Sequence, residues 1–373
     1  MKKILLSVVV SSLALFASAQ QYEIRAHITG FSNGAKFYLL DPELNTNIDS
    51  AIIQNDHFVI KGRLYDTPKS LWVMTQAGGR YRYVTLLIGN DTIDIKGDIK
   101  DMPYDMVITG SKTEDEHNLF ISQTGKFYKK QNELVEQARA LTGDSAKIKS
   151  KEIWKTIGKI DSATNVAVKN FIIQNLNTYE ALNELFFMKG TFKDSLQQMY
   201  NSLKPELKQS LFGQRIATYL KVGDKLKIGD MFTDFEALDQ YGKKHRVSDF
   251  KGKYILLDFS ETYCGPCIES VPDMKNIIKK YGDKMTIITF SGDGSKDLWL
   301  KGVKRDKPIW LSMWDGKGIY GETPLKYGAN GFPDFIVIDP DGKIINNWMG
   351  YGKNDDGRGS LETNIDKLFA KNK

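Results

Sequence analysis

Residues 254–267 read YILLDFSETYCGPC, and their pattern predicts the architecture of the C-terminal region. Residues 254–259 form a mostly apolar run, which is typical of a buried strand. Cys264 and Cys267 follow it, and they are the only two cysteines among 373 residues. A helical pattern then runs to about residue 281. A strand that delivers two cysteines, separated by two residues, to the start of a helix predicts a thiol–disulfide active site.

The position of the two cysteines predicts different roles for them. Unpaired backbone N–H groups and the helix macrodipole stabilise a thiolate at a helix N-terminus, where Cys264 is expected. Cys264 would therefore attack a substrate disulfide, and Cys267, one turn deeper, would resolve the mixed disulfide. Asp258, on the preceding strand, is the candidate general base for Cys267, directly or through a water. The alternative for Asp258 is a solvated carboxylate at a strand end. No cofactor is expected beyond the redox-active disulfide.

The first residues predict export. Lys2 and Lys3 precede an apolar stretch, and residues 17–19 fit the small-residue pattern of a cleavage site. We expect a signal peptide over residues 1–19, with an uncleaved membrane anchor as the alternative. An exported chain with a single cysteine pair has no disulfide framework, so this pair is expected to react rather than to cross-link the fold.

Charge excludes one class of partner. Basic residues exceed acidic ones by six over the whole chain, and they are scattered among the acidic ones. No basic cluster with interleaved aromatic residues occurs, so nucleic-acid binding is not expected.

The remainder of the chain divides by its periodicity. Residues 20–111 carry short alternating runs between turn residues, which predicts an all-β domain, either a meander or a sandwich. His27 and His57 stand alone in these runs, as surface or packing residues usually do. Residues 112–221 predict a helical segment, with apolar positions at steps of three and four. It would act as a spacer or bundle, or serve to form a homodimer. Residues 222–373 alternate strands and helices.

Residues 257–267 resemble the active-site segment of the thioredoxin family. Asp258 occupies the family's acidic position six residues before the first cysteine, and Pro272 matches the proline that kinks its active-site helix. Residues 331–333 (GFP) resemble its cis-proline loop. The resemblance implies an α/β thioredoxin fold for residues 222–373, and it implies protein disulfides as substrates. The residues expected to contact the substrate are Tyr263, Gly265, Pro266, Phe332, Pro333 and Gly350.

The segment 222–253 resembles the exported, cytochrome-maturation (TlpA-like) and peroxiredoxin (AhpC-TSA-type) branch of this family. The whole layout is similar to exported thioredoxin-like proteins of Gram-negative bacteria that carry an N-terminal β domain of unknown role. That implies the periplasm or cell envelope, and a membrane or periplasmic thiol as electron donor. Two positions depart from the family pattern. Tyr263 replaces the usual Trp, and Ser270 stands where the cytochrome-maturation branch often has Glu.

The same residues leave three alternative functions. Zinc binding by the two cysteines needs further ligands, and neither His117 nor His245 has ligand spacing. A thiol peroxidase would need Thr three places before its cysteine, whereas Thr262 lies two before Cys264. A third reading is an interaction platform of the cell envelope with vestigial redox activity. The Gly-Pro pair between the cysteines resembles the reducing thioredoxins, which favours a protein-disulfide reductase. An oxidising compartment would then require an electron donor.

Overall fold

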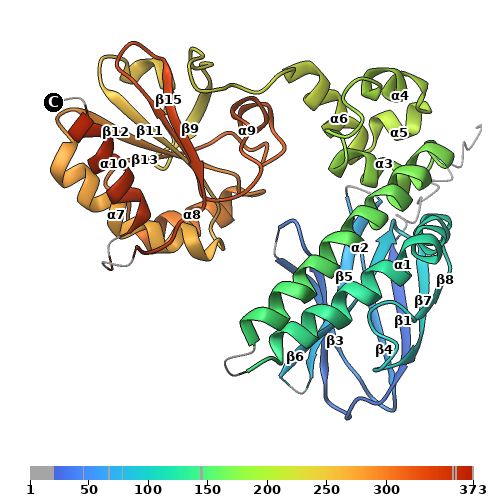
Figure 1. The fold of residues 1–373 in the computed structure, drawn as a ribbon. Coiled ribbons are helices and arrows are strands. Elements are labelled where there is room, and N and C mark those ends of the chain that lie inside the picture. Colours follow the sequence, from blue (N-terminus) through green and yellow to red (C-terminus); the bar gives the residue numbers. More distant parts are fainter. Residues whose placement is uncertain are drawn as a thin grey trace, which may run out of the picture.

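The computed structural model describes residues 21–371, apart from residues 45, 66–67, 78, 143–145, 355–356 and 358. The expected signal peptide over residues 1–19 lies outside the described residues. Within the described ranges, no helix is both long and apolar enough to cross a membrane. The chain forms a β-sandwich, a group of helices and an α/β unit, in that order (Figure 1).

The N-terminal part is a sandwich of two sheets, whose described strands run in the orders β4-β1-β7-β8 and β3-β2-β5-β6. Alternate side chains of β1 are buried, from Tyr22 to Ile28, as the period of two requires. One apolar core joins both sheets and includes Phe37, Val73 and Ile93. The β1–β7 pair is parallel, so the chain follows a sandwich rather than a simple meander. The strands are β1 (Tyr22–Thr29), β2 (Lys36–Asp41), β3 (Thr46–Ile52), β4 (His57–Gly62), β5 (Lys69–Ala77), β6 (Arg80–Ile88), β7 (Thr92–Asp98) and β8 (Val107–Thr109).

A helical segment follows, and residues that favour helix starts mark the beginning of two of its helices. The Thr178 hydroxyl accepts a hydrogen bond from the Ala181 N–H and caps α3, and Pro205 occupies the first turn of α5. The two long helices α1 and α2 lie side by side along the sandwich (Figure 1). The helices are α1 (Lys112–Arg139), α2 (Ala146–Gln174), α3 (Tyr179–Phe187), α4 (Leu196–Ser202), α5 (Pro205–Gln209) and α6 (Leu211–Val222).

Hydrogen bonds join the first turns of helix α1 to the sandwich. The Thr113 hydroxyl donates to the Leu87 carbonyl at 2.7 Å, and the Glu114 carboxyl accepts from the Leu87 N–H at 2.9 Å. The Asn118 amide donates to the Ile108 carbonyl at 2.8 Å. The start of the helical segment is therefore fastened to β6 and β8 and is not a free spacer.

The C-terminal part is a mixed sheet whose described strands run in the order β10-β9-β13-β12-β11-β14-β15. Strand β11 lies inside it, parallel to β12 and antiparallel to β14. Helix α7 follows β11 directly. The elements are β9 (Glu236–Asp239), β10 (Lys244–Arg246), the 3-10 helix η1 (Val247–Phe250), β11 (Tyr254–Ser260), α7 (Gly265–Tyr281), β12 (Met285–Ser291), α8 (Lys296–Asp306), β13 (Leu311–Trp314), α9 (Glu322–Tyr327), β14 (Asp334–Ile338), β15 (Ile344–Met349) and α10 (Ser360–Lys371).

The alternation of side chains along β11 determines the face of the sheet on which Asp258 lies. Ile255, Leu257 and Phe259 belong to the core on one face, and Leu256 belongs to the core on the other face, which α7 and α10 cover. Because successive side chains point to opposite faces, Asp258 shares the face of Leu256 and lies under α7.

A junction joins all three parts. The Arg215 guanidinium on α6 donates to Glu43 in the β2–β3 hairpin and lies over the ring of Tyr320, 4.3 Å from its centroid, in the loop before α9. At the tip of the same hairpin, Leu44 packs against Gly294, where an added Cβ would collide with its Cδ2 atom. The sandwich thus touches the β12–α8 loop of the α/β unit.

Candidate redox site at the start of helix α7

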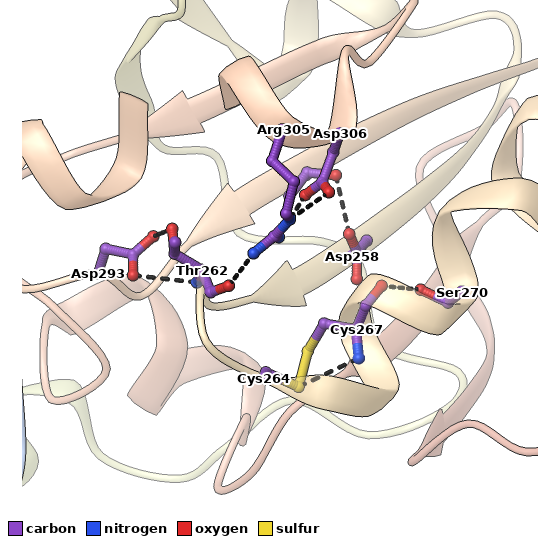
Figure 2. The surroundings of a disulfide bond; sticks show 9 residues. Asp258, Thr262, Cys264, Cys267, Ser270, Asp293, Arg305 and Asp306 are labelled. Carbon is purple, nitrogen blue, oxygen red and sulfur yellow. Dashed lines mark hydrogen bonds and ion pairs between the residues drawn. A yellow bond between two sulfur atoms is a disulfide. The ribbon is translucent and has the colours of Figure 1, made fainter. Parts of the chain in front are cut away.

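The two cysteines form a disulfide at the N-terminus of α7 (Figure 2). Cys264 is the N-cap residue, and its Sγ accepts a hydrogen bond from the Cys267 N–H at 3.2 Å. This N–H is one of the groups at a helix start that have no partner within the helix. The same group, together with the macrodipole, would stabilise a thiolate on Cys264 once the disulfide is reduced.

The two sulfur atoms differ in their access to solvent. Cys267 is only 3% exposed, whereas Cys264 is partly exposed. The residues around Cys264 that were expected to contact the substrate are open to solvent: Tyr263 is 53% exposed, and Gly265 and Pro266 are exposed. A substrate sulfur can therefore approach Cys264 but not Cys267.

Asp258 lies buried beneath the pair, with a relative exposure of 1%. The solvated strand-end alternative for this residue is therefore wrong. Its Oδ2 accepts a hydrogen bond from the Thr289 hydroxyl at 2.8 Å. The Thr289 oxygen in turn lies 2.9 Å from the Trp310 indole nitrogen, which can only donate, so the hydroxyl proton must point to Asp258. The other carboxyl oxygen, Oδ1, is buried without a hydrogen-bond partner.

A small cavity of about 40 Å³ connects Asp258 to Cys267, since both residues line it. That volume can hold at least one water molecule. Burial raises the pKa of Asp258 to about 7; the Thr289 hydrogen bond opposes this effect, and the charges of Asp306 and Asp334 add to it. A carboxyl group that titrates near neutral pH and lines a cavity with a thiol can exchange a proton with that thiol.

The predicted cis-proline loop lies at the same edge of the sheet. The Phe332–Pro333 peptide bond is cis, and β14 pairs Asp334 with Phe259 of β11. Pro333 therefore lies just before β14, next to the end of β11 from which the chain continues to Cys264. The Gly350 N–H donates to the Pro333 carbonyl at 2.8 Å, so two of the expected substrate-contact positions are directly bonded. Gly350 has φ +87°, a conformation that favours glycine.

The Phe332 ring packs against Gly292, a residue that the sequence did not indicate. A Cβ at Gly292 would lie 2.6 Å from the Phe332 Cζ atom, so only glycine lets the ring come this close to the β12–α8 loop. This loop therefore contacts Phe332 at Gly292 and Leu44 at Gly294.

A group of polar residues around the cysteine motif was also missed. Asp293 accepts from the Thr262 N–H at 3.1 Å, and its other carboxyl oxygen lies 2.8 Å from the Thr262 hydroxyl. The Arg305 guanidinium donates to the Thr262 carbonyl and pairs with Asp306 (Figure 2). Asp293, Arg305 and Asp306 lie 31 to 44 positions after Thr262, so no local pattern indicates them.

Two further carboxyl groups near the site have raised pKa values. Burial raises the pKa of Glu261 to about 7, and the charge of Asp293 adds to the effect. Burial also raises the pKa of Asp334 to about 7, against the opposing charge of Lys225. At the position where a glutamate occurs in the cytochrome-maturation branch, the Ser270 hydroxyl is buried and donates to the Cys267 carbonyl at 2.8 Å.

The four histidines lie away from the cysteines. His27 and His57 are exposed, as expected of surface or packing residues, and their rings stack across β1 and β4 with centroids 4.2 Å apart. His117 lies 3.2 Å from a Glu180 oxygen, and His245 lies 2.9 Å from Asp239. In the part of the chain that the structure describes, no group of three or more His, Cys, Asp or Glu side chains could hold a metal ion.

Comparison with known proteins agrees with this geometry. Residues 252–344 match a family model described as thioredoxin-like, and residues 22–117 match a domain of unknown function, DUF4369. The thiol-disulfide oxidoreductase ResA of Bacillus cereus is 34% identical over 128 residues, which are 34% of this chain and 72% of that relative. The chain belongs to the thiol-disulfide oxidoreductases. The predicted thioredoxin-like fold of the C-terminal region is confirmed, as are the sheet-rich N-terminal region and the helices between them.

Two other proteins are also similar to this oxidoreductase. The thioredoxin-like protein YneN of Bacillus subtilis is 27% identical over 130 residues, 34% of this chain and 74% of that protein. The solved thioredoxin domain of a thiol-disulfide oxidoreductase from Bacteroides vulgatus is 28% identical, with a TM-score of 0.34, and the match covers 39% of this chain and 99% of that one. The matched DUF4369 segment runs into the first turns of α1, which are bonded to the sandwich.

Proposed function

We propose that this oxidoreductase reduces disulfides in polypeptide substrates outside the cytoplasm. The observation that carries the proposal is the difference between its two cysteines. Cys264 is accessible at the start of α7, and Cys267 is buried above the cavity that holds Asp258. One cysteine is thus placed to meet the substrate and the other to release it.

The reaction begins with the reduced pair. The Cys264 thiolate attacks one sulfur of the substrate disulfide, and the other substrate sulfur leaves as a thiolate that takes a proton from water. The Cys267 thiol then gives its proton to Asp258, directly or through a water in the cavity. The Cys267 thiolate attacks the Cys264 Sγ atom and expels the second substrate thiolate. Two electrons pass from the cysteine pair to the substrate, and the pair ends as the disulfide.

The substrate chain would lie in an extended form along the cis-proline loop. Strand pairing with a backbone edge gives affinity without requiring a particular sequence. Tyr263, next to Cys264, is exposed, Phe332 precedes the cis proline, and the Gly350–Pro333 hydrogen bond holds the loop in place. These contacts suit a polypeptide better than a small peroxide, which needs no such surface.

The direction and place of the reaction rest on the sequence. Gly265 and Pro266 match the dipeptide of the reducing thioredoxins, and residues 1–19 have the pattern of a signal peptide. We place the activity in the periplasm or cell envelope, where a membrane or periplasmic thiol would return the pair to its reduced state. Exposed apolar side chains on α2, including Trp154 and Val166, would be the contact surface if the helical segment forms a homodimer.

The reduction potential of the pair tests the direction. The purified chain from residue 20 onward is equilibrated in dithiothreitol and glutathione buffers, and the fraction of disulfide is measured by thiol alkylation. A value near about −270 mV, as in thioredoxin, supports a reductase. A value near about −120 mV would reverse the direction to disulfide formation. A pair that does not cycle in any buffer would leave the interaction platform as the function.

A further inference from the structure

We propose that Arg305 and Asp306, at the C-terminal end of α8, act as a charge pair that controls the proton exchange between Asp258 and Cys267. This inference rests on the proposed function, because it concerns the step in which Cys267 releases the substrate. Neither residue belongs to the cysteine motif or to the cis-proline loop. Both line the same cavity as Asp258 and Cys267.

The geometry of the pair is well defined. The Arg305 Nε atom lies 2.6 Å from Asp306 Oδ1, and its Nη2 atom lies 2.6 Å from Asp306 Oδ2. The remaining guanidinium nitrogen, Nη1, donates to the Thr262 carbonyl, two residues before Cys264. Arg305 therefore links the end of α8 to the segment that carries the cysteines (Figure 2). The two side chains are 35% and 22% exposed, so they stand between the buried cavity and solvent.

The carboxyl group of Asp258 is arranged to respond to this pair. Its Oδ2 is occupied by the Thr289 hydroxyl, and its Oδ1 is buried without a partner. The free oxygen must therefore be either protonated or hydrated in the cavity. The charges nearest to the cavity then decide which form is favoured.

The charged groups that face Asp258 come from several elements. Asp306 on α8 and Asp334 on β14 disfavour its ionisation, in addition to its burial. Arg305 is the cation among the residues described as lining the cavity, and Glu261 and Asp293 line it near Thr262.

The other neighbours of Asp258 in this cavity carry no fixed charge. Thr289 on β12 donates its hydroxyl proton, and Cys267 on α7 supplies the exchanging thiol. Outside the cavity, the Lys275 ammonium on α7 donates to the Asp306 backbone carbonyl at 2.8 Å. The Arg305–Asp306 pair supplies both a cation and an anion to this environment, and it can be altered without touching the reacting groups.

Removal of Asp306 and removal of Arg305 should shift the ionisation of Asp258 in opposite directions. Asp306→Asn removes a negative charge and leaves the Arg305 cation unpaired, so ionisation of Asp258 becomes easier. Arg305→Gln leaves the Asp306 carboxylate unneutralised, so ionisation becomes harder. General damage to the fold would not produce shifts of opposite sign. These are positioning residues, since neither contacts a reacting sulfur.

The experiment uses 5,5′-dithiobis(2-nitrobenzoate) with the reduced full chain in a stopped-flow instrument. The first nitrothiobenzoate leaves when Cys264 attacks, and the second leaves when Cys267 resolves the mixed disulfide. The rate of the second phase is measured against pH. We expect its midpoint to fall by about 0.5 pH unit or more in Asp306→Asn and to rise by a similar amount in Arg305→Gln.

Two further variants separate charge from structure. Arg305→Lys keeps the charge and should keep the midpoint within about 0.3 unit of the wild type, even if the fold is loosened. Asp297→Asn removes a carboxylate from the first turn of the same helix, outside the cavity, and should leave the profile unchanged. Midpoints that stay fixed, or that move in the same direction in both charge variants, would overturn the inference. A wild-type chain that releases no second nitrothiobenzoate would overturn the proposed function and this inference with it.

Discussion

Arg215 and Glu43, which are 172 positions apart, form a two-pronged ion pair: Nη1 lies 2.6 Å from Oε1, and Nη2 lies 2.7 Å from Oε2. The side chains are 15% and 29% exposed, and Arg215 also lies over the ring of Tyr320. Paired guanidinium and carboxylate groups in this geometry are stronger than ordinary surface ion pairs. The contact therefore holds the sandwich, the helices and the thioredoxin-like domain together.

Arg215→Ala should make the domains unfold more independently. The variant loses the ion pair and the contact with Tyr320, at a cost of about 1–3 kcal/mol in the free energy of unfolding. We expect calorimetry to show a lower melting temperature and a wider separation between transitions. Arg215→Lys, which keeps the charge but not the two-pronged geometry, should lie between the two. A thermogram identical to that of the wild type would show that the junction does not couple the domains.

The two cysteines should fail in different ways when each is replaced. Cys267→Ser should accumulate a mixed disulfide with a disulfide-bonded substrate such as insulin, because Cys264 attacks but nothing releases the product. Cys264→Ser should form no such adduct and should lose at least about 100-fold in turnover. Intact-mass spectrometry under non-reducing conditions distinguishes them. An adduct on Cys267 in the Cys264→Ser variant would contradict the roles that their exposure assigns.

Asp258→Asn should stabilise the oxidised protein near neutral pH. The pKa of Asp258 is raised to about 7 in the folded chain, above its value in the unfolded chain. The folded protein therefore binds the extra proton, and stability from this residue is lost as pH rises from about 4 to about 7. Asparagine has no proton to lose, so the variant should gain up to about 2–4 kcal/mol over the wild type at pH 7 and little at pH 4. Urea unfolding at both pH values measures the difference.

The same substitution should slow catalysis. Without a carboxylate to take the Cys267 proton, the second phase of the nitrothiobenzoate reaction should fall by roughly 10²-fold or more at pH 7, while the first phase stays near the wild-type rate. A variant that is both more stable and slower would identify Asp258 as a residue retained for function at the expense of stability. Equal slowing of both phases would point instead to a general disturbance of the site.

Gly294→Ala should push the hairpin tip away from the thioredoxin-like domain, because its Cβ would collide with Leu44. Amide exchange in residues 36–52 should then become at least about threefold faster, as it does where packing is lost. Adding Leu44→Ala removes the obstacle, so exchange should return toward the wild-type rate. Faster exchange in the double variant than in Gly294→Ala alone would show that the glycine does not serve this contact.

The sequence predicts the chemistry of the site better than its surroundings. Asp258 lies on a strand, and Cys264 and Cys267 lie at the start of the helix that follows it, so strand alternation and helix-start chemistry suffice to place them. The loop at Pro333 is visible because it precedes a strongly apolar strand. The roles of these residues remain predictions that the variants above test.

Arg305, Asp306 and Asp293 could not be found in the same way. In the sequence they are ordinary charged residues at a helix end and in a loop, and only the packing of α8 against the cysteine segment brings them to Thr262. Glu114 is similar, because an acidic residue in a first helical turn looks like an exposed one, yet it is buried and bonded to Leu87. Long-range contacts of this kind depend on how whole elements pack, which no local pattern encodes.

The contact of Leu44 with Gly294 changes how the N-terminal sandwich should be viewed. A domain joined only by a flexible tether would present its cargo to the cysteines at a concentration set by the length of that tether. Here the hairpin rests on the loop whose other end holds Phe332, so distance and direction between the two surfaces are set by packing. A partner bound by the sandwich would therefore approach Cys264 from one fixed side, at a distance set by the packing of the two domains.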